Sequence, residues 1–380
     1  MTTRQQLGCR TAFKNRLRDR ILNLFSIYFL KEKYNISRMG IKMDKGRCVL
    51  LKESLSRIGL IGIIVLTLIT LFPREGWCND FERRDVTFKS QGLDCAAWYY
   101  IPNDVKSGEK RPAIVMANGL SAVKEMGLDK FAEKFAEAGF VVLVFDYRYF
   151  GASEGEPRGQ FFYYDQQQDY RNAITWVSLQ KEVDSQRVGL WGTSLSGGHV
   201  LHLAAFDKRV KAVVAQVPAS YTWETYYQNA KPEALEGMRE WFAKNRSNEY
   251  TTGIVQYIPV VAPQGQPSCL SQKESYEWFT EAAKTAPNWE NKVTAESIDI
   301  NKEYAPMTYI HIISPTPLLM IVADHDNVCP TDVQKRGFAL AGEPKQLVVV
   351  EGSHFSVYSG NAFIKASTSA VDWFKKYLKS

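Results

Sequence analysis

The chain has 380 residues, of which 45% are hydrophobic and 13% aromatic, enough for one large α/β domain of about 250–300 residues with additional segments. Its formal net charge is +6, yet residues 1–50 hold 12 Lys and Arg against 3 Asp and Glu, so the remaining 330 residues carry a net charge of −3. Because the basic excess is confined to the N-terminal leader, the charge gives no reason to expect that the folded domain binds nucleic acid.

An uncharged apolar segment of fifteen residues, 58–72, follows the basic leader. It is shorter than the about 20 apolar residues of a membrane span, and it suits the central region of a secretory signal with cleavage before Asn79. We therefore expect 58–78 to be a signal peptide or a retained membrane anchor, with 79–380 exported or held outside the cytoplasm. A buried core helix is the alternative interpretation of 58–72.

The leader itself, residues 1–57, has two interpretations. It can be the basic n-region of a long signal, or the true start can be Met39 or Met43, which makes the preceding residues an over-long annotation. Both interpretations leave the expected folded domain unchanged.

Cysteine and histidine spacing gives no sign of a disulfide framework or a metal centre. The chain has six cysteines and no C-x-x-C pair, and an odd number would remain after cleavage, which argues against a framework of bridges. His199 and His202 lie three residues apart on one predicted helix without a nearby carboxylate, so core packing is the expected role. We expect no metal and no organic cofactor.

Short apolar runs alternate with helical segments between residues 113 and 217. An opening antiparallel pair is expected at 85–89 and 96–101. This alternation predicts right-handed crossovers and a mainly parallel, doubly wound sheet with helices on both faces. The expected buried strands are 113–117, 140–145, 188–191 and 211–217.

The alternation stops between residues 219 and 314, where no buried strand run occurs and aromatic residues are frequent. We interpret this stretch as an inserted helical cap, which would form the wall of an apolar acyl pocket. Ordinary core packing is the alternative for most of these aromatic residues. The sheet pattern then resumes with a strand at 318–323, a helix at 331–340, a strand at 346–350 and a closing helix at 362–378.

The segment 187–200, RVGLWGTSLSGGHV, has the plan of a nucleophile elbow: a strand, a tight turn that carries a serine, and a helix. Ser194 is the expected nucleophile because Gly192 directly follows the strand. The fifth position of the G-x-S-x-G pattern is Ser196 here, and an elbow centred on Ser196 is one alternative. A Gly/Ser-rich loop that only packs tightly is the other.

A serine hydroxyl needs a base, and the base needs a group that orients it. In this plan the acid and then the histidine follow the serine in loops after late strands. His354 follows the strand at 346–350. Asp326 and Asp324 compete in the loop after 318–323, and motif analogy favours Asp326. The backbone amides of Leu120 and Leu195 are the expected donors to the oxyanion.

Six motifs together resemble the α/β-hydrolase superfamily, in particular its dienelactone-hydrolase-like branch, which includes bacterial serine hydrolases and fungal polyketide transferases and thiohydrolases. They are NGLSAVKEMG, FDYRYFGASEGEPR, DYRNAITWV, LWGTSLSGGHVL, PTPLLMIVADHD and EGSHF. The resemblance extends from about residue 85 to the C-terminus. It implies that Ser194 is the nucleophile, Asp326 the acid and His354 the base. The pair Asn118-Gly119 replaces the His-Gly that is frequent in the family, which puts the side-chain hydrogen bonds of that loop in question.

The expected function is a serine hydrolase that cleaves an ester or thioester of a small or medium acyl group through an acyl-enzyme. An acyltransferase of the same fold, a serine peptidase and a non-catalytic binding protein are the alternatives. The expected partner is a small-molecule substrate, with membrane association only through 58–72. The sequence does not indicate an oligomeric state.

Overall fold

The structure is a computed structural model and describes residues 80–227 and 230–379. The predicted leader, 1–57, and the predicted signal or anchor, 58–78, lie outside the described residues. None of the helices within the described ranges combines the length and hydrophobicity that a membrane span requires.

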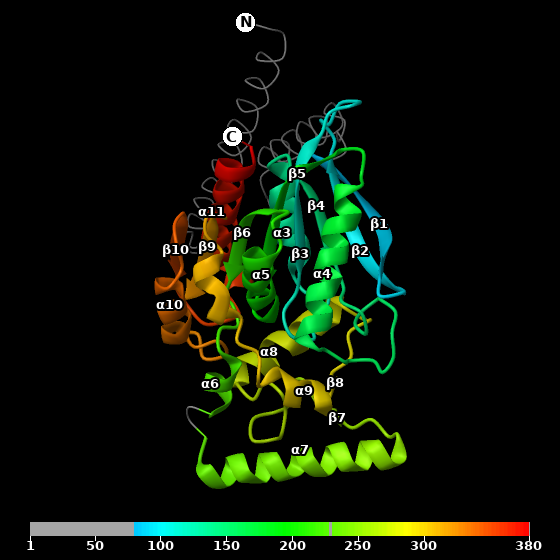
Figure 1. Ribbon diagram of the computed structural model, residues 1–380, viewed down its shortest axis with the longest axis vertical. Coiled ribbons are helices and arrows are strands. Elements are labelled where there is room, and N and C mark those ends of the chain that lie inside the picture. Colours follow the sequence, from blue (N-terminus) through cyan, green and yellow to red (C-terminus); the bar gives the residue numbers. More distant parts are fainter. Residues whose placement is uncertain (1–79, 228–229, 380) are drawn as a thin grey trace, which may run out of the picture. The chain divides into compact units, whose positions relative to one another are not determined.

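A single eight-stranded sheet forms the centre of the described unit, in the order β1-β2-β4-β3-β5-β6-β9-β10. The pairs β1·β2 and β2·β4 are antiparallel, and all the other neighbouring pairs are parallel. The predicted fold class, a mainly parallel doubly wound sheet, is confirmed (Figure 1). The strands are β1 (Phe81–Ser90), β2 (Leu93–Pro102), β3 (Arg111–Ala117), β4 (Val141–Phe145), β5 (Val183–Thr193), β6 (Val210–Gln216), β9 (Leu318–Ala323) and β10 (Lys345–Val350).

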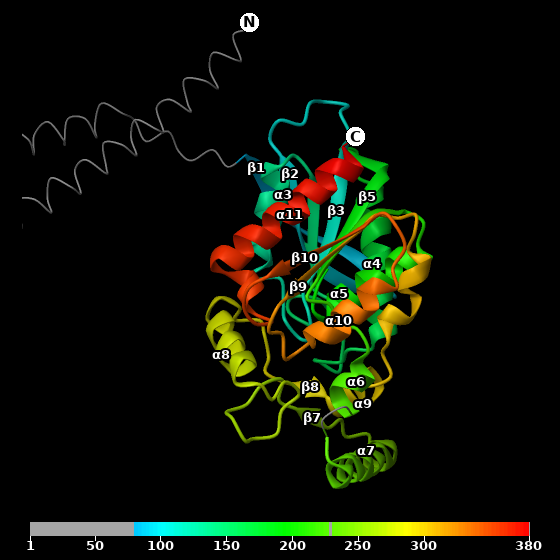
Figure 2. The same ribbon diagram turned by 90° about the vertical axis from the view of Figure 1, so that its left-hand side faces the viewer.

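Helices cover both faces of the sheet, and this explains why β4 and β9 are continuous apolar runs rather than alternating ones. Every residue of these two strands is buried. Figure 2 shows α3 (Leu128–Glu137) and α11 (Gly360–Leu378) on one side of the sheet, where Phe135 and Phe374 pack edge to face with ring centroids 5.5 Å apart. The opposite face carries α4 (Tyr163–Ser178), α5 (Leu195–Phe206) and α10 (Thr331–Ala339).

The predicted cap interval lies between β6 and β9 and is mainly helical. Figure 1 shows these elements beyond the carboxyl ends of the parallel strands, with the long helix α7 outermost. The interval also holds a two-stranded pair that the sequence pattern did not indicate, because each strand has only two residues. The elements are α6 (Thr222–Tyr227), α7 (Pro232–Thr252), β7 (Tyr257–Ile258), α8 (Lys273–Ala282), η1 (Ala283–Thr285), β8 (Val293–Thr294), α9 (Ala295–Asn301) and η2 (Pro306–Ile312).

Candidate active site

Ser194 stands at the sharp turn between β5 and α5. Its backbone has φ 57° and ψ −121°, a conformation that side-chain-bearing residues rarely adopt and that clusters at functional sites. The neighbouring glycines are required by close backbone approach. A Cβ on Gly192 would overlap the carbonyl of Ser196, and one on Gly197 would lie 2.8 Å from the Cα of Pro218.

His354 lies within hydrogen-bonding distance of both other side chains of the predicted triad. The Nε2 atom of His354 is 3.0 Å from the Oγ of Ser194. Its other ring nitrogen, Nδ1, is 2.8 Å from the Oδ2 of Asp326. His354 and Asp326 are both buried. The turns after β5, β9 and β10 therefore bring together a hydroxyl, a carboxylate and an imidazole, in that order, with the imidazole between the other two.

Asp326, rather than Asp324, faces the histidine. Its Oδ1 accepts hydrogen bonds from the backbone amides of Val328 at 2.9 Å and Cys329 at 2.8 Å. Its Oδ2 also accepts from the side chain of Gln334 at 3.1 Å. These three donors hold the carboxylate in the orientation in which it accepts a hydrogen bond from His354. Nothing in the sequence pattern indicated Gln334, because its role depends on how α10 packs against the acid loop.

Asp324 points to a different loop. Its Oδ1 accepts from the backbone amide of Gly352 at 2.8 Å and lies 2.7 Å from the Nδ1 of His325. The carboxylate of Asp324 therefore stabilises the loop that carries His354, and its hydrogen bonds go to Gly352 and His325 rather than to the ring of His354.

The predicted oxyanion donors, the amides of Leu120 and Leu195, belong to the two loops that meet at Ser194. Neither amide donates a hydrogen bond to another group within residues 80–227 and 230–379. Gly119 approaches Ser194 so closely that a Cβ there would lie 2.8 Å from the Cβ and 3.2 Å from the Oγ of Ser194. Two free amides beside a serine hydroxyl are what a developing oxyanion needs.

Ser196 does not compete for the role of nucleophile. Its Oγ donates to the backbone carbonyl of Asn118 at 2.5 Å and contacts the hydroxyl of Tyr147. It is fully buried, and the hydrogen bonds of the His354 ring go to Ser194 and Asp326 instead. The elbow is therefore centred on Ser194.

A narrow apolar pocket opens beside Ser194. Its volume is about 20 Å³, room for about one water molecule. The cap contributes Trp278 and Phe279 from α8, and the ring of Trp278 is stacked on Phe355 at 5.0 Å. No Asp, Glu, Lys or Arg is among the described residues that line it. The lining residues are Asn118, Gly119, Leu120, Ala122, Ser194, Leu270, Trp278, Phe279, His354, Phe355 and Tyr358.

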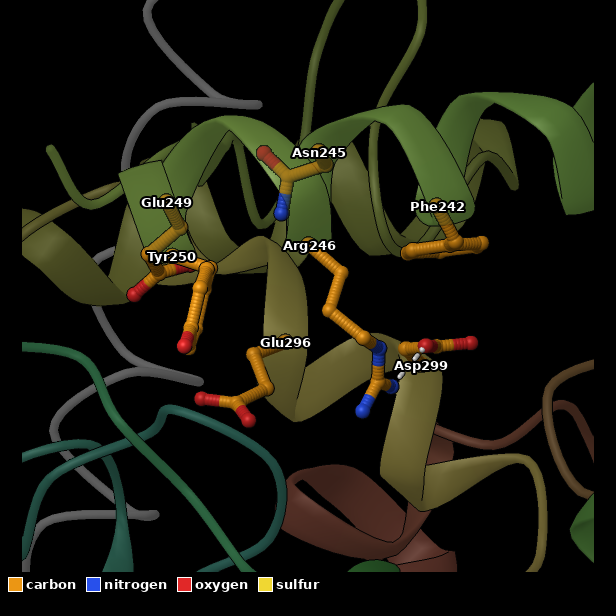
Figure 3. Close-up of a pocket in the computed structure, with 7 residues that line it drawn as sticks. All are labelled: Phe242, Asn245, Arg246, Glu249, Tyr250, Glu296 and Asp299. Atoms are coloured by element: carbon orange, nitrogen blue, oxygen red, sulfur yellow. Dashed lines mark hydrogen bonds and ion pairs between the residues drawn. The ribbon is translucent and has the colours of Figure 1, made fainter. Parts of the chain in front are cut away.

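A larger pocket of about 230 Å³ lies elsewhere, between α7 and α9 of the cap (Figure 3). Arg246 and Asp299 form an ion pair at 2.6 Å within it. The lining holds no serine, cysteine or histidine among the described residues, so it offers no nucleophile for acyl transfer. The residues are Phe242, Asn245, Arg246, Glu249, Tyr250, Glu296 and Asp299.

The described part of the chain holds no group of three or more His, Cys, Asp or Glu side chains that could bind a metal ion. His199 is instead enclosed in the core, with Nδ1 2.8 Å from the hydroxyl of Tyr304 and Nε2 2.9 Å from the Oε1 of Gln166. Burial lowers the pKa of His199 to about 3. The imidazole is therefore neutral and structural.

Residues 92–356 match the X-Pro dipeptidyl-peptidase family, S15. The chain belongs to this family. The matched range contains Ser194, Asp326 and His354, together with the whole cap interval. Membership places the S15-family chain in the α/β-hydrolase superfamily, as the motifs predicted.

The chain is also similar to individual proteins and to a solved structure. The S15-family chain is 31% identical over 293 residues to the quorum-quenching protein AidA of Acinetobacter baumannii, covering 77% of this chain and 94% of that protein. It is 33% identical over 264 residues to the thiohydrolase aneE of Aspergillus aculeatus, covering 66% of this chain and 81% of that protein. The crystal structure of the α/β hydrolase GrgF from Penicillium superposes with a TM-score of 0.67 and 27% identity, covering 79% of this chain and 100% of that one.

These similarities agree with the predicted hydrolase class. Relatives of the S15-family chain carry the names thiohydrolase and polyketide transferase, which fits an α/β hydrolase of esters or thioesters or an acyltransferase. The narrower placement in a dienelactone-hydrolase-like branch stays a prediction.

Proposed function

We propose that this protein is a serine hydrolase that cleaves an ester or thioester of an uncharged acyl group through an acyl-enzyme. The observation that carries the proposal is the line from Ser194 Oγ to His354 Nε2 at 3.0 Å and from His354 Nδ1 to Asp326 at 2.8 Å. This is the geometry in which a base removes a hydroxyl proton while a carboxylate fixes the tautomer of the base.

The proposed reaction has two halves. Ser194 Oγ attacks the acyl carbonyl as its proton passes to Nε2 of His354. The imidazolium, held by Asp326, then gives that proton to the departing alcohol or thiol. Water enters, loses a proton to His354 and attacks the acyl-enzyme. The acid leaves, and the serine hydroxyl regains its proton.

In each half the carbonyl oxygen becomes negatively charged. The amides of Leu120 and Leu195 are the proposed donors to it, and their freedom from other acceptors in the described structure supports this role. Loss of one such donor typically lowers the rate by about 10²–10³-fold. Because the donors are backbone groups, their positions depend on the path of the loop. Gly119 sets that path, because a side chain at this position would collide with Ser194.

The pocket favours an acyl ester or thioester over a dipeptide. A dipeptidyl-peptidase must hold the ammonium group of its substrate, and a buried ammonium needs an anionic partner. The described residues that line the pocket beside Ser194 include no carboxylate. The relatives named thiohydrolase and polyketide transferase support the same choice.

Acyl transfer is the second candidate, and the aromatic cover of the pocket favours it. Trp278 and Phe279 of the cap line the pocket beside Ser194, and such a cover limits the access of bulk water to the acyl-enzyme. Product analysis with competing alcohols distinguishes the two: transfer yields a new ester, whereas hydrolysis yields the free acid whatever the alcohol concentration.

The decisive test uses the full chain and its Ser194→Ala variant. Wild-type protein should hydrolyse short p-nitrophenyl esters and should be labelled by a fluorophosphonate, which reacts with activated serines. The variant should lose both properties while it keeps its circular dichroism spectrum. Undiminished hydrolysis by Ser194→Ala, or wild-type protein that resists the label, would end the proposal.

We also propose that the catalytic domain acts outside the cytoplasm, on the ground of the apolar segment 58–72 behind a basic leader. Cell fractionation combined with mass spectrometry of the N-terminus tests this. A mature protein that begins at Asn79 in the exported fraction is expected, and an intact chain in the cytosol would refute the proposal.

A further inference from the structure

Two positions depart from the family pattern, and the structure brings them into direct contact. Position 196, usually glycine in the G-x-S-x-G elbow, is a serine, and Asn118 replaces a frequent histidine. The Oγ of Ser196 donates to the main-chain carbonyl of Asn118 at 2.5 Å. This bond joins the loop that carries the nucleophile to the loop that carries the Leu120 amide.

We propose that Ser196 is a positioning residue that holds the oxyanion loop against the nucleophile, within a hydrogen-bond chain from Tyr147 through Ser196 to Asn118. The proposal rests on the function proposed above, because it assigns the second oxyanion donor to that loop. Ser196 itself does not touch the substrate.

The direction of the chain follows from the number of protons. A serine hydroxyl has one proton, and Ser196 gives it to the Asn118 carbonyl, which can only accept. The hydroxyl of Tyr147, which contacts the Oγ of Ser196, must therefore be a donor. All three residues are buried, so water does not compete for these bonds. The ring of Tyr147 is itself held edge to face against Phe145, with centroids 5.2 Å apart.

The Asn118–Gly119 peptide is held at both of its polar atoms. Its oxygen accepts from Ser196, and its N–H donates to the Oδ1 of the Asn118 side chain at 2.9 Å. The Nδ2 of the same side chain donates to the carbonyls of Val123 at 2.9 Å and Met126 at 3.1 Å. The plane of this peptide sets the direction in which the chain continues through Gly119 to the amide of Leu120. Asn118 thus shapes the loop, and Ser196 anchors it to the elbow.

A second hydroxyl group, from Tyr170, joins the two strands that lead into the same junction. The hydroxyl of Tyr170 accepts from the amide of Ala117 at 3.0 Å and donates to the carbonyl of Trp191 at 2.9 Å. It therefore joins the ends of β3 and β5 just before they enter the two loops. The Tyr170 hydroxyl also lies close to the Ser196 hydroxyl, but both bonds of the bridge go to main-chain atoms. Removal of the Ser196 hydroxyl should therefore affect the loop locally without separating the strands.

The test compares the full wild-type chain with Ser196→Ala and Ser196→Gly on a short p-nitrophenyl ester. Without the hydroxyl, the Asn118 carbonyl loses its donor and the Leu120 amide is less well directed. We expect kcat to fall by about 10–100-fold, less than the loss of a whole donor, with KM changed by less than about threefold. A boronic acid, which forms a tetrahedral adduct on serine, should bind more weakly by the same factor as kcat.

Controls separate positioning from general destabilisation. Ser367→Ala removes another buried serine hydroxyl, in α11 on the opposite face of the sheet, and should leave kcat and boronic acid affinity unchanged. Tyr147→Phe removes the donor to Ser196 together with a contact to the hydroxyl of Tyr170, leaves the Ser196 hydroxyl bonded to Asn118, and should give a smaller loss. Its combination with Ser196→Ala should lower kcat by less than the product of the single effects, because both act on one chain.

The outcomes are distinguishable from failure of the proposed function. If the wild-type protein neither hydrolyses esters nor reacts with a fluorophosphonate, the proposed function fails, and this proposal falls with it. If the wild-type protein is active and labelled but Ser196→Ala and Ser196→Gly keep their kcat and boronic acid affinity, only the positioning role is overturned. If Ser196→Ala does not fold, Ser196→Gly and Tyr147→Phe decide by the same readouts.

Discussion

Trp289 of the cap donates a hydrogen bond from its indole Nε1 to the Oγ of Ser121, at 3.2 Å. Ser121 directly follows Leu120, the proposed oxyanion donor, and its backbone lies in the left-handed region at φ 61°. The bond links two residues that are 168 positions apart. The cap thus contacts the oxyanion loop as well as covering the pocket.

Trp289→Phe tests this link. The variant removes the donor but keeps a ring that can pack against Phe279, whose centroid lies 5.4 Å away. One hydrogen bond is worth about 0.5–1.5 kcal/mol, so we expect kcat/KM for a short ester to fall by about threefold to tenfold. Trp223 of α6 is half-exposed, so Trp223→Phe is the matched control and should behave as wild type. Equal kcat/KM for all three proteins would mean that the link has no catalytic effect.

The two aspartates of the acid loop should respond very differently to the same change. Asp326→Asn disturbs the partner of His354, and comparable loss of the orienting carboxylate lowers kcat by about 10⁴-fold. Asp324→Asn keeps an oxygen that can accept from Gly352 and should change kcat by less than about threefold. Steady-state ester hydrolysis measures both, and a large loss in Asp324→Asn with little loss in Asp326→Asn would reverse the assignment.

Trp278→Ala should widen the range of acyl groups accepted. Removal of the indole that stacks on Phe355 enlarges a pocket of about 20 Å³, so longer chains gain room. Each buried methylene contributes about 0.8 kcal/mol, and we expect the ratio of kcat/KM for hexanoate over acetate esters to rise at least about tenfold. Trp241→Ala, on the exposed side of α7, should leave the ratio unchanged. An unaltered ratio in Trp278→Ala would show that this ring does not limit chain length.

The buried His199 should make the fold sensitive to acid. Its pKa is about 3 in the folded chain because burial opposes the charge, whereas the ordinary value is about 6.5. Between these values the unfolded chain binds a proton that the folded chain does not, so stability is lost as the pH falls through this window. The contribution of this one group is at most about 1.4 kcal/mol per pH unit.

Urea unfolding between about pH 4 and pH 7 measures this slope. His199→Gln should reduce the slope, because the variant lacks the group that must stay neutral. The exposed His311 provides the control, and His311→Gln should keep the wild-type slope. If His199→Gln also keeps it, another group accounts for the sensitivity to acid.

The sequence predicted most reliably the elements that are buried on both sides. The strand expected at 318–323 is β9 as observed, because an uninterrupted apolar run admits few alternatives. The elbow strand was predicted at 188–191, but β5 extends from Val183 to Thr193. Its first part includes the polar residues Ser185 and Gln186, which are exposed and look like a loop.

Residues 170–179 have the sequence pattern of a helix, and the observed helix α4 begins earlier, at Tyr163. The first turns contain Gln166 and Gln167, polar residues that are nonetheless buried. Gln166 is buried because its amide oxygen contacts His199 from another helix. Such a partner is fixed by tertiary packing and cannot be read from local periodicity.

The candidate site also has one part that could be predicted from the sequence and one part that could not. The loops that carry Ser194, Asp326 and His354 follow strands with clear patterns, so their positions could be predicted. The contacts between Ser196 and Asn118 and between Trp289 and Ser121 depend on the assembled fold. So does the pocket between α7 and α9, whose residues come from two helices about 50 positions apart.

The point at which the cap enters the chain has a consequence for how this protein can change. The cap leaves the framework after β6 and returns before β9, so it separates the segment that carries the serine from the segment that carries the acid and the histidine. The cap side chains that line the pocket, such as Trp278 and Phe279, are therefore encoded in a different stretch of the gene from the three proposed catalytic residues. A graft of the cap from a relative should transfer selectivity onto an unchanged reaction centre, provided that the graft keeps a donor for Ser121.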